Sequence, residues 1–458
     1  MKLWNTLKKT MLEHPLRTVC EDESELSYRE LIGAAEQLAG QLTGLSCCAI
    51  LCTSELMAAR ALLACFAAGV TAVPLSKRYG EQHCRKILDK LSPPAVITND
   101  GGALLVKRAE APSYQAPAVS PALIMCTSGT TGEPKGAMLT EENILTNTAD
   151  IAAYFDIGGQ DTLLIARPLY HCAVLTGEFL TALMRGANIR FYSGVFNPPK
   201  LPEYIRRYGI TVFCGTPTML SLMRRFVRSG EELPLRRIAV SGECMSRETG
   251  LAIAEAFPAA KIYSAYGLTE AGPRVSYLPP ELFGEYPDCV GVPLKSVKLK
   301  IVRENGTAAN AGERGLLYVR GGNVMAGYYR DPEKTAAVLR DGWLCTGDIA
   351  LITSKGLLKI TGRNDDLIVK AGMNIYPQEI EGALKTDRRV HEVLAYGYAS
   401  RAGTQIGLKI AGDFTSVKEV KQLCARVLPP YQRPAKTDLV KELEKNGSGK
   451  IKRGERHA

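Results

Sequence analysis

The amino-acid sequence predicts an α/β protein with a large layered N-terminal domain, mostly parallel sheets and a β-rich lobe, followed by a small α+β C-terminal domain. From residue 28 onward, helical patterns alternate with short β-rich runs, which is typical of parallel α/β layers. After about residue 290 the pattern changes to short strands and turns. A polar, turn-rich segment at 361–366 then precedes the last α+β stretch, so we place a domain boundary there, with domains at 1–362 and 363–458.

The expected strands of the large domain follow one another between helical stretches. They are 48–53, 71–75, 95–98, 122–125, 163–166, 188–192, 211–214, 238–241 and 261–264, with 297–302 and 315–319 in the β-rich lobe. Ligands of such folds bind at the carboxyl ends of the parallel strands. We therefore expect a site where the strands ending near residues 125 and 264 meet.

Composition bounds the class of protein. A chain of 458 residues with 46% hydrophobic residues can bury one large core and a second small one. The first 15 residues lack the apolar run of a signal peptide, and the apolar region 58–75 is interrupted by Arg60, so we expect no membrane insertion. Thirteen scattered cysteines indicate a reducing, cytoplasmic location.

The net charge of +10 has two interpretations. A nucleic-acid partner is disfavoured because acidic residues alternate with the basic ones and no basic stripe is interleaved with aromatics. Anionic ligands such as ATP and CoA, or an acidic carrier protein, account for the surplus equally well.

Residues 127–132 read Thr-Ser-Gly-Thr-Thr-Gly and lie shortly before a lysine. Small residues let backbone N–H groups converge on a polyphosphate, while the hydroxyls add donors and the lysine adds charge. The expected strand before this loop and the helix cap at Thr140 favour phosphate binding over an ordinary Ser/Thr turn. Without a Gly-Lys-Ser/Thr sequence, a kinase or GTPase is disfavoured. The candidate phosphate-binding residues are Thr127, Ser128, Gly129, Thr130, Thr131, Gly132 and Lys135.

Four further segments carry residues suited to nucleotide chemistry. Tyr266 offers a flat face for adenine, and Glu270 offers the oxygen ligand that Mg²⁺ prefers. Asp348 can accept hydrogen bonds from ribose hydroxyls, Arg363 can donate to the same sugar, and Lys450 can offset negative charge where two anions meet. Each residue alone also fits a structural role: a core tyrosine, a turn aspartate, a solvated lysine.

Taken in order, Thr-Ser-Gly-Thr-Thr-Gly-x-Pro-Lys-Gly, Tyr-Gly-Leu-Thr-Glu at 266–270, and the segments 343–348, 362–365 and 449–453 resemble the motifs of the AMP-forming adenylating superfamily. This superfamily includes acyl-CoA and aryl-CoA ligases, adenylation domains of peptide synthetases, and luciferases. The resemblance covers nearly the whole chain. It implies ATP, Mg²⁺, and CoA or phosphopantetheine as cofactors.

The resemblance also assigns roles. It implies that the nucleotide binds Ser264, Ala265, Tyr266, Gly267, Asp348 and Arg363, beside the phosphate loop. It implies catalytic roles for Lys450, Thr269, Glu270 and His171, and metal contacts from Thr130 and Glu270. It further implies that the small C-terminal domain is mobile and rotates about a hinge at Asp365, carrying Lys450 out of the site and the loop 370–376 in.

The organic acid is expected to bind near His171, Gly177, Gly215, Gly242 and Tyr266. No aspartate lies between residue 161 and Gly177, which disfavours an α-amino acid, since amino-acid-activating members place one there. The small and apolar residues after His171 suit an aryl or medium aliphatic acid. Glu178 leaves a cationic group on the substrate open.

The sequence thus indicates an ATP-dependent, AMP-forming carboxylic acid ligase that makes an acyl-adenylate and then a thioester, with CoA favoured as the thiol. A stand-alone adenylation enzyme that loads a carrier protein remains an alternative. A non-catalytic nucleotide-binding protein is a second one, although it predicts damaged motifs, and Lys135, Glu270, Asp348, Arg363 and Lys450 are all present. A luciferase-like oxygenase has no support in the residues.

Overall fold

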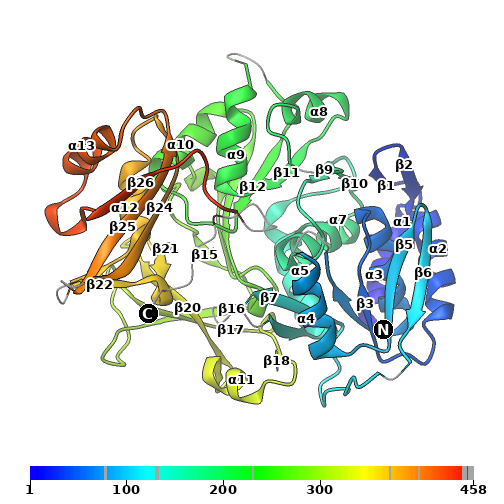
Figure 1. The fold of residues 1–458 in the computed structure, drawn as a ribbon. Coiled ribbons are helices and arrows are strands. Elements are labelled where there is room, and N and C mark those ends of the chain that lie inside the picture. Colours follow the sequence, from blue (N-terminus) through cyan, green and yellow to red (C-terminus); the bar gives the residue numbers. More distant parts are fainter. Residues whose placement is uncertain are drawn as a thin grey trace.

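The structure is a computed structural model that describes residues 1–76, 80–110, 112–128, 134–194, 196–228, 232–370, 373–400, 403–445 and 451. Large sheets alternate with layers of helices (Figure 1). The predicted α/β class with a large and a small domain is confirmed, and the predicted strands are found within a few residues of their expected bounds.

The largest sheet among the described residues has nine strands, and its central six are parallel. The outer strands β2, β14 and β15 pair antiparallel. In spatial order the strands are β15 (Val292–Pro293), β14 (Ser276–Leu278), β13 (Lys261–Tyr266), β12 (Arg237–Ser241), β11 (Val212–Gly215), β9 (Thr162–Ile165), β10 (Asn188–Phe191), β1 (Thr18–Glu21) and β2 (Ser24–Ser27).

A second sheet of seven strands has a parallel centre and antiparallel edges. Its order is β18 (Gly327–Tyr328), β8 (Pro134–Leu139), β7 (Leu123–Ser128), β4 (Thr71–Pro74), β3 (Cys47–Ile50), β5 (Ala95–Asp100) and β6 (Ala103–Arg108). Sequence patterns did not reveal β8. The chain after the phosphate loop therefore returns as an antiparallel strand before it enters a helix.

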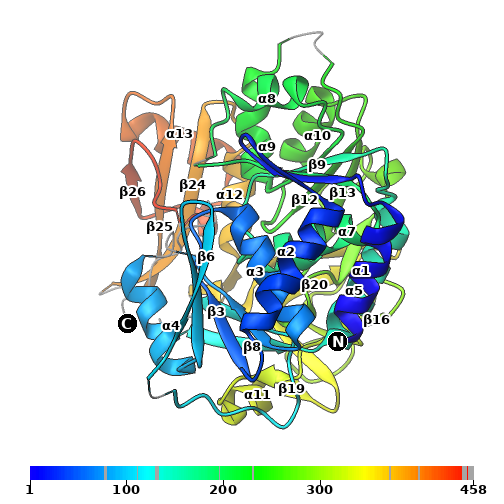
Figure 2. The same ribbon diagram turned by 90° about the vertical axis from the view of Figure 1, so that its right-hand side faces the viewer.

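Helices fill the space between these two sheets and cover their outer faces (Figure 2). Helix α3 contacts β3 and β4 of one sheet and β1 of the other, which places it in the middle layer. The middle layer comprises α1 (Lys2–Glu13), α2 (Tyr28–Gln41), α3 (Glu55–Ala68), α5 (Glu141–Phe155), α6 (Cys172–Val174), the π-helix η2 (Leu175–Leu180) and α7 (Thr181–Met184). The outer faces carry α4 (Glu81–Leu91), α8 (Leu201–Arg207), α9 (Pro217–Met223), the 3₁₀ turn η3 (Arg224–Phe226) and α10 (Arg247–Ala256).

Helix α5 begins where the sequence indicated. The side chain of Thr140 accepts a hydrogen bond from the backbone N–H of Asn143 at 3.1 Å, and Asn143 Oδ1 accepts from the N–H of Thr140 at 2.9 Å. This reciprocal cap satisfies two donors that a helix start leaves without partners. It fixes the start of the helix that follows the β7–β8 hairpin.

The β-rich lobe is antiparallel, as its short runs predicted. It contains β16 (Val297–Val302), β17 (Gly315–Gly321), β20 (Trp343–Ile352), β19 (Leu339–Arg340) and β21 (Leu358–Arg363). Short helical turns connect the elements around it: η4 (Thr269–Ala271), η5 (Pro280–Leu282), α11 (Pro332–Val338) and η6 (Asn364–Asp366).

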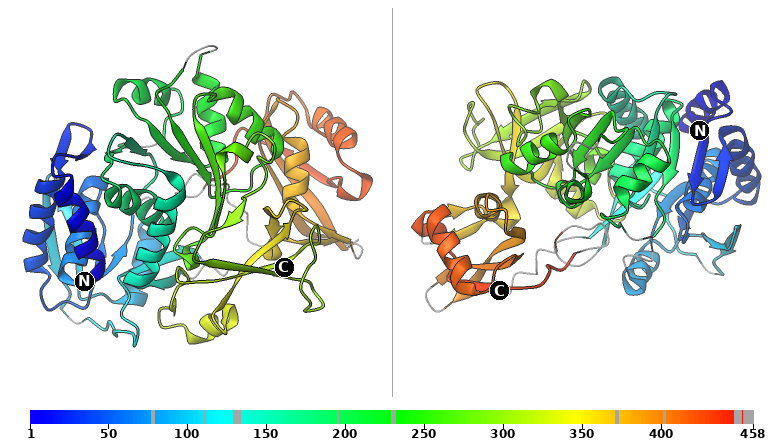
Figure 3. Two further views of the ribbon diagram at one scale, coloured as in Figure 1. Left: turned by 180° about the vertical axis from the view of Figure 1, so that it is seen from behind. Right: turned by 90° about the horizontal axis from the view of Figure 1, so that it is seen from above.

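The C-terminal portion builds its own hydrophobic core, whose buried members all lie between Ile368 and Leu428. It contains β22 (Ile368–Lys370), β23 (Met373–Ile375), α12 (Pro377–Leu384), β24 (Val390–Ser400), β25 (Gly403–Gly412), α13 (Val417–Val427), η7 (Pro430–Gln432) and β26 (Lys436–Leu439). Figure 3 shows this portion, in orange and red, on the side of the molecule opposite the N-terminal helices. Within the described residues, no helix has the length and apolar character needed to cross a membrane.

Candidate active site

Residues predicted to form the site lie at the carboxyl edge of the nine-stranded sheet. β11 ends at Gly215, β12 runs into Gly242, and β13 ends at Tyr266. Because these strands are parallel neighbours, their ends meet at one edge. Ser264 and Ala265 are buried within β13 just before Tyr266.

Gly267 lets another segment approach this edge closely. A Cβ at this position would lie 1.6 Å from the carbonyl oxygen of Pro273, so only glycine fits. The backbone N–H of Val275 donates to the carbonyl of Tyr266 at 2.9 Å, which continues the contact. The segment 272–275 is thereby held directly against the end of β13.

Tyr266, Asp348 and Arg363 form one hydrogen-bonded group. The Tyr266 hydroxyl donates to Asp348 Oδ2, and Arg363 Nη1 lies 3.2 Å from Asp348 Oδ1. β20 and β21 place these last two residues opposite each other. Asp348 is only 6% exposed; its burial raises the pKa of the carboxyl group, while Arg363 and Tyr266 lower it. A carboxylate with several acceptor positions can still accept from a sugar hydroxyl here.

A second group joins the phosphate hairpin to Glu270. The Lys135 ammonium lies 5.4 Å from the centre of the Tyr328 ring, and the Tyr328 hydroxyl donates to Glu270 Oε1 at 2.8 Å. Burial and the nearby Glu270 raise the pKa of Tyr328, so its hydroxyl stays a donor. The backbone carbonyl of Glu270 accepts from the N–H of Met325 at 2.9 Å. Thr269 and Glu270 both lie in the turn η4 after β13.

The described part of the phosphate hairpin consists of its two strands. Thr127 on β7 faces Lys135 on β8, and the backbone of Ser128 ends β7. Lys90 Nζ donates to the carbonyl of Pro134 at 2.8 Å, which ties α4 to the loop end of the hairpin, where Pro134 pairs with Ser128. The predicted residues Gly129, Thr130, Thr131 and Gly132 lie outside the described residues.

Glu270 suits a magnesium ion that is held by one carboxylate together with substrate phosphates. Within the part of the chain that the structure describes, no cluster of three or more His, Cys, Asp or Glu side chains could hold a metal ion. Mg²⁺ is commonly held by one or two carboxylates together with substrate phosphates and water. Glu270 beside the phosphate hairpin matches that mode of binding, whereas Thr130 lies outside the described residues.

The predicted acid-binding segment follows β9. His171 immediately precedes α6, is partly buried, and its ring lies 4.1 Å from that of Tyr170. Gly177 is buried in the π-helix η2, where an added Cβ would lie 3.4 Å from Pro273 and 3.5 Å from the Arg274 guanidinium. Gly177 thus faces the same 272–275 segment that borders Tyr266.

A buried ion pair lies in this segment, and sequence reasoning did not foresee it. Arg167 Nη2 donates to Glu178 Oε1, and the two side chains are 7% and 0% exposed. The sequence had left Glu178 open as a partner for a cationic substrate; Arg167 already occupies one of its oxygens. The available signal was a pair of opposite charges in an otherwise apolar run. Tyr328 had no comparable signal, because only the tertiary fold brings it to Glu270.

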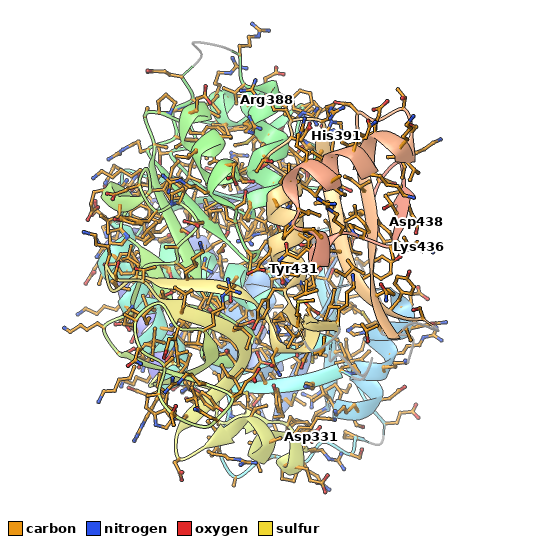
Figure 4. The ribbon with its side chains drawn as sticks, turned by 90° about the vertical axis from the view of Figure 1, so that its left-hand side faces the viewer. Asp331, Arg388, His391, Tyr431, Lys436 and Asp438 are labelled. Carbon is orange, nitrogen blue, oxygen red and sulfur yellow. The ribbon has the colours of Figure 1, made fainter. Side chains whose placement is uncertain are left out.

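Polar contacts join the C-terminal portion to the rest of the chain. Arg314 Nη2 lies 2.6 Å from Glu379, and Arg225 Nη2 lies 3.4 Å from His391 Nε2. Figure 4 labels His391 on this side of the molecule. Asp365 is exposed in η6, 4.0 Å from Arg363.

Lys450 lies outside the described residues, whereas Lys445 before it and Ile451 after it are described. Lys445 and Ile451 form an isolated antiparallel bridge, and Lys445 Nζ pairs with Glu392 on β24. Lys445 is therefore attached to the sheet of the C-terminal portion.

Comparisons with known proteins match most of the chain. The family model described as AMP-binding enzyme matches residues 7–329. A feruloyl-CoA synthase from an Amycolatopsis species is 32% identical over 346 residues, covering 73% of this chain and 68% of that protein. A long-chain-fatty-acid–CoA ligase from Haemophilus influenzae is 30% identical over 341 residues, covering 72% and 60%.

Solved structures match over nearly the full length. o-Succinylbenzoate CoA synthetase from Bacillus subtilis, in complex with its acyl-adenylate intermediate, has a TM-score of 0.85 and 27% identity and covers 98% of this chain and 96% of its own. The same protein in complex with ATP and magnesium ion has a TM-score of 0.83 and 28% identity, with 98% of each chain covered.

Proposed function

Because this chain belongs to the family of AMP-binding enzymes, we propose that it activates an aryl or aliphatic carboxylic acid as an acyl-adenylate and transfers the acyl group to the thiol of CoA. Family and relatives establish the coarser part: the chain is an AMP-forming acid–thiol ligase of the acyl-CoA synthetase type that uses ATP and Mg²⁺. The identity of the acid and the roles of single residues belong to the proposal.

The observation that carries the proposal is the adjacency of two polar groups at the end of β13. Tyr266 bonds to Asp348, and four residues later Glu270 bonds to Tyr328 beside Lys135. One group suits a nucleoside and the other suits phosphates. Their spacing along a single strand end lets one ATP molecule contact both.

In the proposed first step, the acid's carboxylate oxygen attacks the α-phosphorus of ATP and pyrophosphate leaves. Asp348 and Arg363 hold the ribose, and Tyr266 lies against the adenine. Lys135 and the residues from Thr127 onward hold the departing phosphates. Glu270 would hold Mg²⁺, which would supply positive charge to neutralise the phosphate oxygens. Tyr328 keeps the Glu270 carboxylate oriented.

Lys450 is proposed to neutralise the charge that accumulates at the α-phosphate. The resemblance of the segment 449–453 to the family's lysine motif supports this role. In the second step the thiol attacks the carbonyl carbon of the adenylate, AMP leaves, and a thioester forms. His171 and Thr269 are proposed to line the approach to this carbon.

We place a domain boundary between residues 362 and 363 and a hinge at Asp365. The separate core between Ile368 and Leu428 supports the boundary, and the exposed position of Asp365 in a short turn supports the hinge. The polar contacts Arg314–Glu379 and Arg225–His391 are of the kind that break at low cost when domains rotate.

ATP–pyrophosphate exchange across a panel of aryl, fatty and amino acids tests the first step. Exchange that depends on one class of acid supports the proposal; an absence of exchange across the panel, with ATP still bound, contradicts it. Release of AMP with free CoA, compared with loading of a purified acidic carrier protein, decides the acceptor. A preference for the carrier protein would overturn CoA as the proposed thiol.

A further inference from the structure

Three ionisable side chains meet beside Gly177, and no step described above uses them. Arg167 follows β9, Glu178 lies in the π-helix η2, and Arg274 follows Pro273 in the segment held against β13. We refer to them as the Arg167–Glu178–Arg274 cluster. π-Helical turns are rare in proteins, and those that do occur are often found at functional sites.

The cluster is buried. Arg167, Glu178 and Arg274 are 8%, 2% and 3% exposed. The ion pair of Arg167 with Glu178 uses one carboxylate oxygen only. Within the described residues, Glu178 Oε2 and Arg167 Nε are buried without a hydrogen-bond partner. Buried polar groups left in this way cost free energy unless a ligand or water satisfies them.

The cluster also carries one positive charge too many. Two guanidinium groups face one carboxylate, and among the ion pairs of the described residues none includes Arg274. The Tyr154 hydroxyl is a hydrogen-bond partner of Arg274 but supplies no negative charge, because burial raises its pKa to about 12. Burial also raises the pKa of the nearby Cys214 thiol, which is therefore neutral as well. A buried guanidinium without an ion-pair partner of its own is unfavourable, and an anionic ligand group would offset that cost.

The position of Arg274 makes such a ligand part of the acid. Its backbone borders Gly267 at the end of β13, and its guanidinium lies beside Gly177, on the proposed acid-binding side. A long alkyl chain placed there would remove water from the charges without replacing its hydrogen bonds. An ammonium group would meet two guanidinium groups and a carboxylate that is already paired.

We infer that the Arg167–Glu178–Arg274 cluster binds the end of the acid remote from the reacting carboxylate, and that the preferred substrate carries a second carboxylate there. This inference rests on the proposed function. Arg274 donates to the second carboxylate, and the Arg167–Glu178 pair positions Arg274 and its surroundings. The inference narrows the substrate class from aryl or aliphatic acids to dicarboxylic acids.

The test compares matched acids in acid-dependent AMP release with CoA. Each pair has one backbone and differs by one carboxylate: benzoic acid against the benzenedicarboxylic acids, and linear C4 to C8 monoacids against diacids. We expect the preferred diacid to exceed its monoacid by about 100-fold or more in kcat/KM, because a site built for a polar group discriminates strongly against its absence. Equal or better use of the monoacid overturns the inference, yet leaves the proposed ligase activity standing.

Variants test whether the preference for the diacid depends on Arg274. Arg274→Met should remove the preference for the diacid chiefly by lowering kcat/KM for the diacid, while Arg274→Lys should retain part of it. Arg388→Met, which removes an exposed guanidinium labelled in Figure 4, serves as the matched control and should keep the preference. Equal losses for both acids in a folded Arg274→Met variant contradict the inference. If Arg274→Met does not fold, the test compares the diacid-to-monoacid ratio of kcat/KM between the wild type and Arg274→Lys. A lower ratio in Arg274→Lys supports the inference, and an equal ratio contradicts it.

Discussion

Replacing Tyr328 with phenylalanine removes one hydroxyl and tests whether Glu270 must be held in place. The hydroxyl donates to Glu270 Oε1 at 2.8 Å, and the remaining ring keeps its place 5.4 Å from the Lys135 ammonium. A hydrogen bond to a charged group contributes about 1.5–3 kcal/mol. Because Glu270 is only partly buried, water can replace part of the lost hydrogen bond, so the expected loss of free energy is about 1–2 kcal/mol. This loss predicts an adenylation rate lower by about 5-fold to 30-fold.

The neighbouring Tyr329 supplies the matched control. Its hydroxyl donates to the carbonyl of Gln115 at 3.1 Å and accepts from the N–H of Gln115 at 3.2 Å, and it makes no contact with Glu270. Tyr329→Phe should lower the free energy of unfolding by about 1 kcal/mol and leave pyrophosphate exchange within about twofold of wild type. If Tyr328→Phe exchanges as fast as Tyr329→Phe at saturating Mg²⁺ and ATP, the positioning role of Tyr328 is wrong.

Four further outcomes are expected. Asp348→Asn should raise the KM for ATP in pyrophosphate exchange by about 10-fold or more, because a charge-assisted contact to the ribose is lost; an unchanged KM would contradict ribose binding. Glu178→Gln should lower the free energy of unfolding by about 3 kcal/mol in urea titrations, because it leaves a buried guanidinium without its anion; a loss below about 1 kcal/mol would mean that the pair is solvated. The hydrogen bond from Arg389 holds the pKa of Asp387 well below its usual range, so this group stabilises the fold fully above about pH 4 and the contribution is lost as the pH falls from there through the lowered pKa; the difference in unfolding midpoint between wild type and Asp387→Asn should be largest at about pH 7 and shrink progressively below about pH 4. Lys450→Ala should abolish pyrophosphate exchange yet still convert a supplied acyl-adenylate to the thioester, and equal loss of both steps would contradict the proposed domain rotation.

Local patterns predicted much of the architecture. The β-rich run 297–302 is β16 with those bounds, and Thr140 caps α5 as the sequence indicated, because the residue pattern of a strand and the cap of a helix depend on residues close together in the chain. The strand Pro134–Leu139 was missed, since its glycine and proline carry no strand signal and its pairing with β7 supplies the stability.

Some residues of the candidate site could be identified from the sequence, whereas others depend on the tertiary structure. Asp348 and Arg363 were identified from their motifs, and β20 and β21 bring them opposite each other. Arg274 lies shortly after the motif at 266–270, yet its significance depends on the burial of Arg167 and Glu178 around it. Charge balance in a buried cluster is a property of neighbours distant in sequence, so no window of the chain reveals it.

By itself, the sequence determined the α/β class, the order of the motifs and the kind of chemistry, because small loop residues, a lysine and a carboxylate at given spacings already select for phosphate and magnesium. Only the tertiary structure decided that Tyr328 links Lys135 to Glu270, and that Glu178 is paired with Arg167 beside an uncompensated Arg274. Burial gives the physical reason. On a surface, water would screen the charges of these side chains, whereas in the interior each charge requires an opposite charge. Among the described residues Arg274 lacks one, which indicates an anionic ligand group.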